Sequence, residues 1–221
     1  MIHDWKIAER EYARHLDRRG RKHAFETLEP GRTALVVVDL VPFFSEANPY
    51  CAGIVPNVSA LARAMRAAGG TVAWVLPSSD RPFPAIAEAL HGVGPAEVYR
   101  LSGGEGPLAE RLSPGVGQAP DDLYVEKTAA SAFFPGRCPL PDLLAVRGVD
   151  TVVIAGTVTN VCCESSARDA TTLGYRVVFA ADANAARTDA EHNAALHTIY
   201  RSFGDVRPTA EILGLLTPAA G

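Results

Sequence analysis

The chain has 221 residues, 48% of them hydrophobic, which suffices for one α/β domain with a full core but not for two ordinary domains. A formal net charge of -4 argues against a nucleic-acid or anionic-membrane binder, because such proteins normally carry a basic excess. The N-terminus has no signal-peptide core and no later stretch is apolar enough to span a bilayer, so we expect a soluble, cytoplasmic protein. The four cysteines fit neither a disulfide framework nor a spaced metal pattern, which favours reduced thiols.

Residues 4–19 have the composition of a helix, with an apolar stripe at helical spacing formed by Trp5, Ala8, Tyr12 and Leu16. This narrow stripe needs a partner, which is either the chain's own domain or a neighbouring subunit. We therefore divide the sequence into an N-terminal helical extension, residues 1–29, and one main domain, residues 30–221.

The apolar run 33–38 predicts a buried strand, and Asp39 follows it at the point where the crevice of a parallel sheet opens. A helix over 56–68 and a strand over 71–76 come next, which together give a right-handed parallel β-α-β unit. Four aromatic residues near predicted strand ends are candidates for lining a substrate pocket: Phe43, Phe44, Trp74 and Phe133.

Residues 81–122 are rich in proline and glycine without the spacing of a phosphate-binding loop, which makes a nucleotide site improbable. We expect a variable lid or a subunit-contact loop here.

The remaining elements alternate in type, with strands over 123–126, 151–155 and 176–180 and helices over 139–146, 161–173 and 189–202. This alternation predicts a single-domain, doubly wound α/β/α sandwich of three layers with a mostly parallel sheet. His192 and His197 on the last helix are better explained as packed or solvated residues than as bases. Asp182 and Asn184 could support the site or simply form a turn.

Cys162 follows a strand, a glycine and a capping turn, which places it at a helix N-terminus. The helix dipole and the unpaired N–H groups there favour a thiolate, and hence a nucleophile. The alternative is that Cys162 is a small buried hydrophobic residue, which is the usual state of a free cysteine.

The segment Gly156-Thr-Val-Thr-Asn-Val-Cys162, followed by Glu164 and by Ala167-Arg-Asp-Ala170, resembles the signature of the isochorismatase-like cysteine hydrolases, among them N-carbamoylsarcosine amidases and ureidoacrylate amidohydrolases. The resemblance covers residues 30–213 and implies a Rossmann-like fold, an Asp39-Lys127-Cys162 triad and a homo-oligomer. It also implies an oxyanion hole made by the Val158 and Cys162 amides, with a cis peptide bond at Thr157-Val158. Val41 stands where the family often has glutamine.

No metal or cofactor is implied, because zinc-dependent nicotinamidases of the same fold carry an Asp-x-His pair after the second strand, and residues 77–82 contain no histidine. The expected reaction is hydrolysis of a small carboxamide or ureido substrate, such as an N-carbamoyl amino acid, a ureidoacrylate-like acid, a biuret-like ureide or maleamate. The alternatives are vinyl-ether hydrolysis and a non-catalytic scaffold. Four arginines could pair with a substrate carboxylate, although surface charge explains most of them equally well: Arg81, Arg137, Arg168 and Arg187.

Overall fold

The computed structural model describes residues 1–79 and 85–216. These residues include a six-stranded sheet. The strands are β1 (Thr33–Val38), β2 (Thr71–Pro77), β3 (Leu123–Lys127), β4 (Thr151–Thr157), β5 (Arg176–Ala185) and β6 (Asp205–Arg207). They lie in the order β3-β2-β1-β4-β5-β6, and every neighbouring pair is parallel. The prediction of a doubly wound α/β fold is confirmed.

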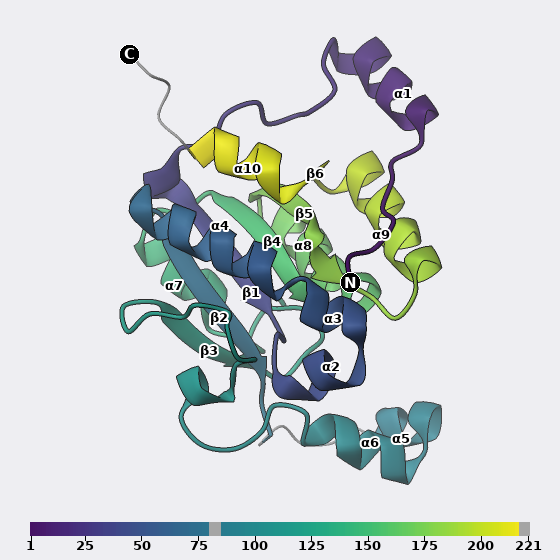
Figure 1. Cartoon of the computed structure of the whole chain (residues 1–221), viewed down its shortest axis with the longest axis vertical. Coiled ribbons are helices and arrows are strands. Elements are labelled where there is room, and N and C mark those ends of the chain that lie inside the picture. Colours follow the sequence, from purple (N-terminus) through teal and green to yellow (C-terminus); the bar gives the residue numbers. More distant parts are fainter. Residues whose placement is uncertain (80–84, 217–221) are drawn as a thin grey trace.

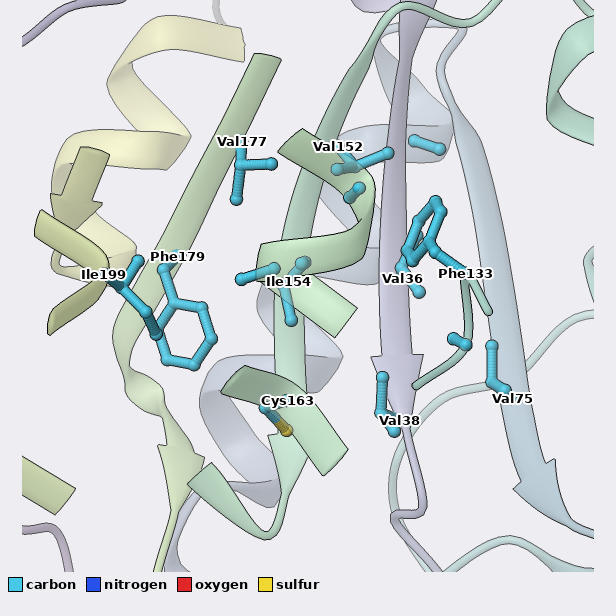
Figure 2. Close-up of a cluster of buried hydrophobic side chains, with 14 of the residues drawn as sticks. Val36, Val38, Val75, Phe133, Val152, Ile154, Cys163, Val177, Phe179 and Ile199 are labelled. Carbon is cyan, nitrogen blue, oxygen red and sulfur yellow. The ribbon is translucent and has the colours of Figure 1, made fainter. Parts of the chain in front are cut away.

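Alternate residues of each strand enter one of two cores, because successive side chains of a strand point to opposite faces of a sheet. Val36 and Val38 join the first core, which is closed by α7 (Leu140–Val146), α8 (Glu164–Thr172) and α9 (Asp189–Ser202). Leu35 and Val37 join the second core, under α4 (Val55–Ala67) and α10 (Thr209–Leu216). The result is three layers, with the sheet in the middle (Figure 1). Figure 2 shows the first core, in which Cys163 packs beside Ile154 and Val38.

Residues 1–8 are not helical, and α1 (Glu9–Arg19) therefore begins later than predicted. Trp5 and Tyr12 pack against the first core, whereas Leu16 is 50% exposed. Two of the four stripe residues thus find their partner within the same chain, whereas Ala8 and Leu16 stay exposed.

The region expected to be a long loop is partly helical. It contains α5 (Ala85–His91), α6 (Val93–Arg100) and a 3-10 turn over Leu108–Arg111, and its residues 81–84 lie outside the described part. Proline and glycine at the ends of short helices are compatible with helix formation, which the expectation of a continuous loop did not allow for. Figure 1 shows α5 and α6 at the bottom of the view, on the side where α2 (Pro42–Ala47) follows β1. The short α3 (Pro49–Gly53) comes directly after α2.

β5 continues past its predicted end at Ala180. Asn184 therefore lies inside the strand rather than in a turn. Its buried side-chain amide donates hydrogen bonds to the carbonyl oxygens of Ile154 (2.9 Å) and Ala180 (2.7 Å) at a register shift between β4 and β5. Asp182 caps α10, accepting hydrogen bonds from the backbone N–H and the hydroxyl of Thr209. Both polar residues therefore stabilise the fold.

Candidate active site

Three titratable side chains converge at the carboxyl ends of three strands. Asp39 directly follows β1, Lys127 is the last residue of β3, and Cys162 lies in a one-turn π-helix, η3 (Thr159–Cys163), between β4 and α8. β1 and β4 are neighbours in the sheet. From this pair, β2 and β3 follow on one side and β5 and β6 on the other. This is the switch point at which open parallel sheets form their ligand crevice.

The backbone around Asp39 is locked by its neighbours. Asp39 has a φ of 50°, a left-handed conformation that is uncommon for a residue other than glycine. Its N–H donates to Val75 O (2.8 Å), and its carbonyl oxygen accepts a hydrogen bond from the Thr157 hydroxyl (2.6 Å). Gly156 permits this arrangement, because a Cβ there would lie 2.1 Å from Val38 O. The segment before Cys162 and the segment carrying Asp39 are thus fitted to each other.

Lys127 joins the other two members of the site. Its ammonium donates to Asp39 Oδ2 (2.8 Å), to Ala129 O (3.1 Å) and to Cys162 Sγ (3.5 Å). An ammonium has three hydrogens, so all of its donors are used. Asp39 and Lys127 are 1% and 2% exposed, whereas Cys162 is partly exposed and can meet a ligand.

The charges around Lys127 determine its protonation. Burial lowers the pKa of Lys127, but the nearby Asp39 carboxylate and the Cys162 sulfur outweigh burial and raise this pKa above its ordinary value. The side chain is therefore an ammonium ion.

The surroundings of Cys162 oppose the thiolate that a helix N-terminus favours. Burial first, and then the negative charge of Asp39, raise the pKa of Cys162 to about 12, although Lys127 acts in the opposite direction. These two influences favour the neutral thiol over the thiolate. The helix N-terminus and the Lys127 ammonium favour a thiolate, whereas burial and the Asp39 carboxylate oppose it.

Loss of the thiol proton to water would leave a net negative charge in a buried site, which is costly. Transfer of that proton to Asp39 would instead leave the summed charge of Lys127, Asp39 and Cys162 unchanged. Asp39 Oδ1 is suited to receive the proton, since it is buried and has no hydrogen-bond partner among the described residues. The arrangement can therefore activate a thiol by internal proton transfer.

The turn between β4 and Cys162 contains the cis peptide bond that the resemblance implied. The Thr157-Val158 peptide bond is cis. Val158 O accepts hydrogen bonds from the N–H groups of Val161 (3.0 Å) and Cys163 (3.3 Å). The amides of Val158 and Cys162 thus belong to one tight turn.

The four aromatic pocket candidates separate into two pairs. Phe43 and Phe44 are partly buried on α2, and Phe43 lines a cavity of about 260 Å³ with Pro42, Leu101 and Arg111 among others. Trp74 and Phe133 are fully buried in the second and first core respectively, so the structure makes them core residues rather than pocket walls. Val41 is also buried in the second core and adds no polar group beside Asp39.

The arginines proposed as carboxylate partners differ in their surroundings. Arg168 hydrogen-bonds Glu164 and lies over the ring of Phe203, and it also borders a cavity of about 250 Å³ lined by Ser131, Phe134 and Ser165 among others. Arg137 and Arg187 are exposed, and Arg81 lies outside the described residues.

Sequence reasoning missed several residues that hold the site together. Ser166 donates to Cys162 O (2.7 Å) and accepts from the N–H of Ala132 (2.9 Å), which ties α8 to the segment after Lys127. His192, which sequence reasoning treated only as packed or solvated, contacts Thr159 of η3. The helical spacing from Cys162 to Ser166 was the one available signal, because contacts between distant segments leave no local pattern.

Across residues 1–79 and 85–216, no group of three or more His, Cys, Asp or Glu side chains is placed to hold a metal ion. The same residues include no helix with the length and hydropathy needed to cross a membrane.

The chain is similar to known proteins in both sequence and fold. The isochorismatase domain family matches residues 33–211. The isochorismatase family protein YwoC of Bacillus subtilis is 33% identical over 189 residues, covering 82% of this chain and 93% of its own length. The ureidoacrylate amidohydrolase RutB of Methylobacterium radiotolerans is 32% identical over 212 residues, covering 83% of this chain and 79% of that protein.

Two solved structures show the same arrangement of strands and helices. A cysteine hydrolase from Pseudomonas syringae superimposes with a TM-score of 0.75 at 29% identity, over 88% of this chain and 96% of that one. N-carbamoylsarcosine amidase from Thermoplasma acidophilum gives a TM-score of 0.63 at 26% identity, over 80% and 96% of the two chains.

Proposed function

The chain belongs to the isochorismatase family of hydrolases, and we propose that it is a cysteine-dependent amidohydrolase that cleaves a C–N bond of a small carboxamide or ureido compound. The observation that carries the proposal is the contact of one ammonium, Lys127, with both Asp39 and Cys162. A thiol with a proton acceptor beside it is what attack on an amide carbonyl requires. Relatives named for ureidoacrylate and N-carbamoylsarcosine hydrolysis support the substrate class.

In the proposed mechanism, Cys162 Sγ attacks the carbonyl carbon while its proton passes to Asp39. The amides of Val158 and Cys162 stabilise the oxyanion of the tetrahedral intermediate. Asp39 then protonates the departing nitrogen, because amine expulsion needs a proton, and a thioester remains on Cys162. Water activated by Asp39 cleaves the thioester, so one amide and one water give one acid and one amine or ammonia.

A panel of small amides and ureides, assayed for ammonia release, tests the proposal. Cys162→Ser should lower turnover of a competent substrate roughly 10⁴-fold or more, because the nucleophile is lost. Cys163→Ala should keep most of the turnover, since the Cys163 side chain is fully buried in the first core. Hydroxylamine should intercept the thioester as a hydroxamate, and chelators should leave turnover unchanged.

Two results would count against this function. One is full activity of Cys162→Ser with loss of activity in Cys163→Ala. The other is efficient vinyl-ether cleavage of isochorismate by Cys162→Ala, with no ammonia released from any amide or ureide.

We also propose that the protein functions as a homo-oligomer. Large apolar side chains are exposed on and after α5 and α6, which favours contact with a second copy: Ile86, Leu90, Val93, Val98, Tyr99 and Leu101. Sedimentation should show an oligomer that Ile86→Ser with Leu90→Ser dissociates. Val146→Ser, at an exposed apolar position on α7, is the control, and a monomeric wild type would refute assembly.

A further inference from the structure

Residues 1–8, called here the strap, cross the fold between α3 and α9 in an extended conformation (Figure 1). The N-terminal ammonium donates to Pro49 O (3.3 Å), and the Lys6 N–H donates to Asn193 Oδ1 (2.7 Å). The Asn193 side-chain amide donates in turn to Asp4 O (2.9 Å). The strap is therefore hydrogen-bonded to elements that lie far from it in sequence.

His3 is the buried anchor of the strap, at 5% exposure. Its Nε2 lies 3.0 Å from the N–H of Ala186 and must accept that hydrogen bond, since a backbone N–H can only donate. The ring proton is consequently on Nδ1, which donates to Asp189 Oδ1 (2.6 Å). The tautomer and the plane of the His3 ring are both fixed.

The His3 ring is stacked between two other rings. Its centroid is 3.8 Å from that of Tyr50 and 4.2 Å from that of His192, and both interplanar angles are 13°. The position of His3 therefore sets how the fully buried ring of His192 can lie.

His192 links His3 to residues 157–163, called here the catalytic turn. Its Nε2 lies 3.0 Å from Ala181 O and must donate, so its Nδ1 accepts from the Thr159 hydroxyl at 2.9 Å. Burial, with the neighbouring His3, lowers the pKa of His192 to about 3 and keeps this acceptor free of a proton. Thr159 is the first residue of η3, directly after Val158, and is fully buried.

We propose that the strap positions the catalytic turn, with His3 acting through His192 and Thr159 on the amides of Val158 and Cys162. This inference rests on the proposed function in that those amides are taken to stabilise an oxyanion. Simple packing would require only an apolar side chain at residue 3. The structure instead pairs each polar atom of His3 and His192 in a chain that ends at Thr159. His3, His192 and Thr159 are positioning residues, because all three side chains are buried and act through one another.

Substitution of His3 tests the proposal, because it should slow substrate turnover at Cys162 but not alkylation of the same residue. His3→Ala should lower kcat about 10–100-fold with little change in KM, because small misplacements of catalytic groups cost that much. Alkylation of Cys162 by iodoacetamide should keep its wild-type rate, since displacement at a saturated carbon forms no oxyanion. His3→Gln, which can still donate and accept, should recover part of kcat. His197→Ala, at a partly exposed position on α9, is the matched control.

Amide hydrogen exchange gives a readout that needs no substrate. In His3→Ala, or in His3→Gln if the alanine variant does not fold, residues 157–163 should exchange faster while β1 stays protected. Unchanged exchange with unchanged kcat, or a uniform rise over the whole chain, would overturn the proposal. If exchange rises only over residues 157–163 but the wild-type protein hydrolyses no amide, the positioning role of the strap stands and the proposed function fails.

Discussion

Two buried carboxylates, Asp39 and Asp122, differ in one respect that separates a reactive group from a structural one. Both side chains are almost inaccessible, at 1% and 3% exposure, and both are paired with a cation. Asp122 accepts hydrogen bonds on both oxygens, from Arg66 Nε (2.7 Å) and Nη2 (2.8 Å), Trp74 Nε1 (2.7 Å) and the N–H of Ala119 (2.9 Å). Asp39 pairs only through Oδ2, and its Oδ1 has no partner within residues 1–79 and 85–216.

This difference decides what each carboxylate can do. Burial raises the pKa of Asp122, but the hydrogen bonds from Arg66, Trp74 and Ala119 outweigh it and leave the pKa lowered. Asp122 therefore remains an anion that holds β2 and the segment before β3 together. Asp39 keeps one buried acceptor oxygen open beside a thiol, which suits a group that must take up and release a proton.

Replacing each carboxylate by an amide should give the largest difference between the roles of Asp39 and Asp122. Asp39→Asn should lower turnover roughly 10²–10⁴-fold, because the proton acceptor is lost while the shape is kept. Asp122→Asn should keep turnover but lower the free energy of unfolding by about 1–3 kcal/mol, since charge-assisted hydrogen bonds are weakened. Steady-state kinetics and urea unfolding measure both. Equal loss of turnover in the two variants would remove the distinction.

The second test concerns the cation that Asp39 pairs with. Lys127→Met should destabilise the fold by about 3–5 kcal/mol, because it leaves a buried carboxylate unpaired. Adding Asp39→Asn to Lys127→Met should restore much of that stability without restoring turnover. A double variant less stable than Lys127→Met alone would show that the pair is not the reason for the loss.

An effect that appears only in acid is expected from His192, whose two ring nitrogens are both hydrogen-bonded, as the oxygens of Asp122 are. Its folded-state pKa of about 3 lies below the unfolded value of about 6.5, so acid favours the unfolded chain, which binds the proton. Its contribution is complete above pH ~6.5 and falls by about 1.4 kcal/mol per pH unit towards pH ~3. Urea unfolding at several pH values gives the free energy of unfolding as a function of pH. This free energy should change less steeply with pH in His192→Gln than in the wild type, with His197→Gln as control. An identical slope would contradict the assignment.

The sequence predicted the parts of the molecule that depend on local pattern. The apolar run that ends at Asp39 and the strand-glycine-turn that leads to Cys162 placed both residues at the edge of the sheet where they lie. The short strand β6 was missed, since three residues with charged ends carry no strand pattern. The helices α5 and α6 were hidden by proline and glycine.

The chemistry of the thiol could not be predicted in the same way. A helix N-terminus alone favours a thiolate, whereas the pKa of Cys162 depends on how deep the residue lies and on the carboxylate brought to it from β1. Similarly, Trp74 looked like a pocket residue by its place near a strand end, but its register directs it into the second core. Both the pKa of Cys162 and the burial of Trp74 depend on contacts between segments that are distant in sequence.

The most direct test of the account is the ultraviolet absorbance of the Cys162 thiolate as a function of pH, taken as the difference between each protein and its Cys162→Ser counterpart. The raised pKa predicts no thiolate signal in the wild type near neutral pH and a rise only in strongly alkaline solution. Asp39→Asn should move that rise to lower pH, because a negative charge is removed while Lys127 remains, even as turnover falls. A thiolate present at neutral pH in the wild type, with a titration that Asp39→Asn does not shift, would contradict activation by proton transfer to Asp39.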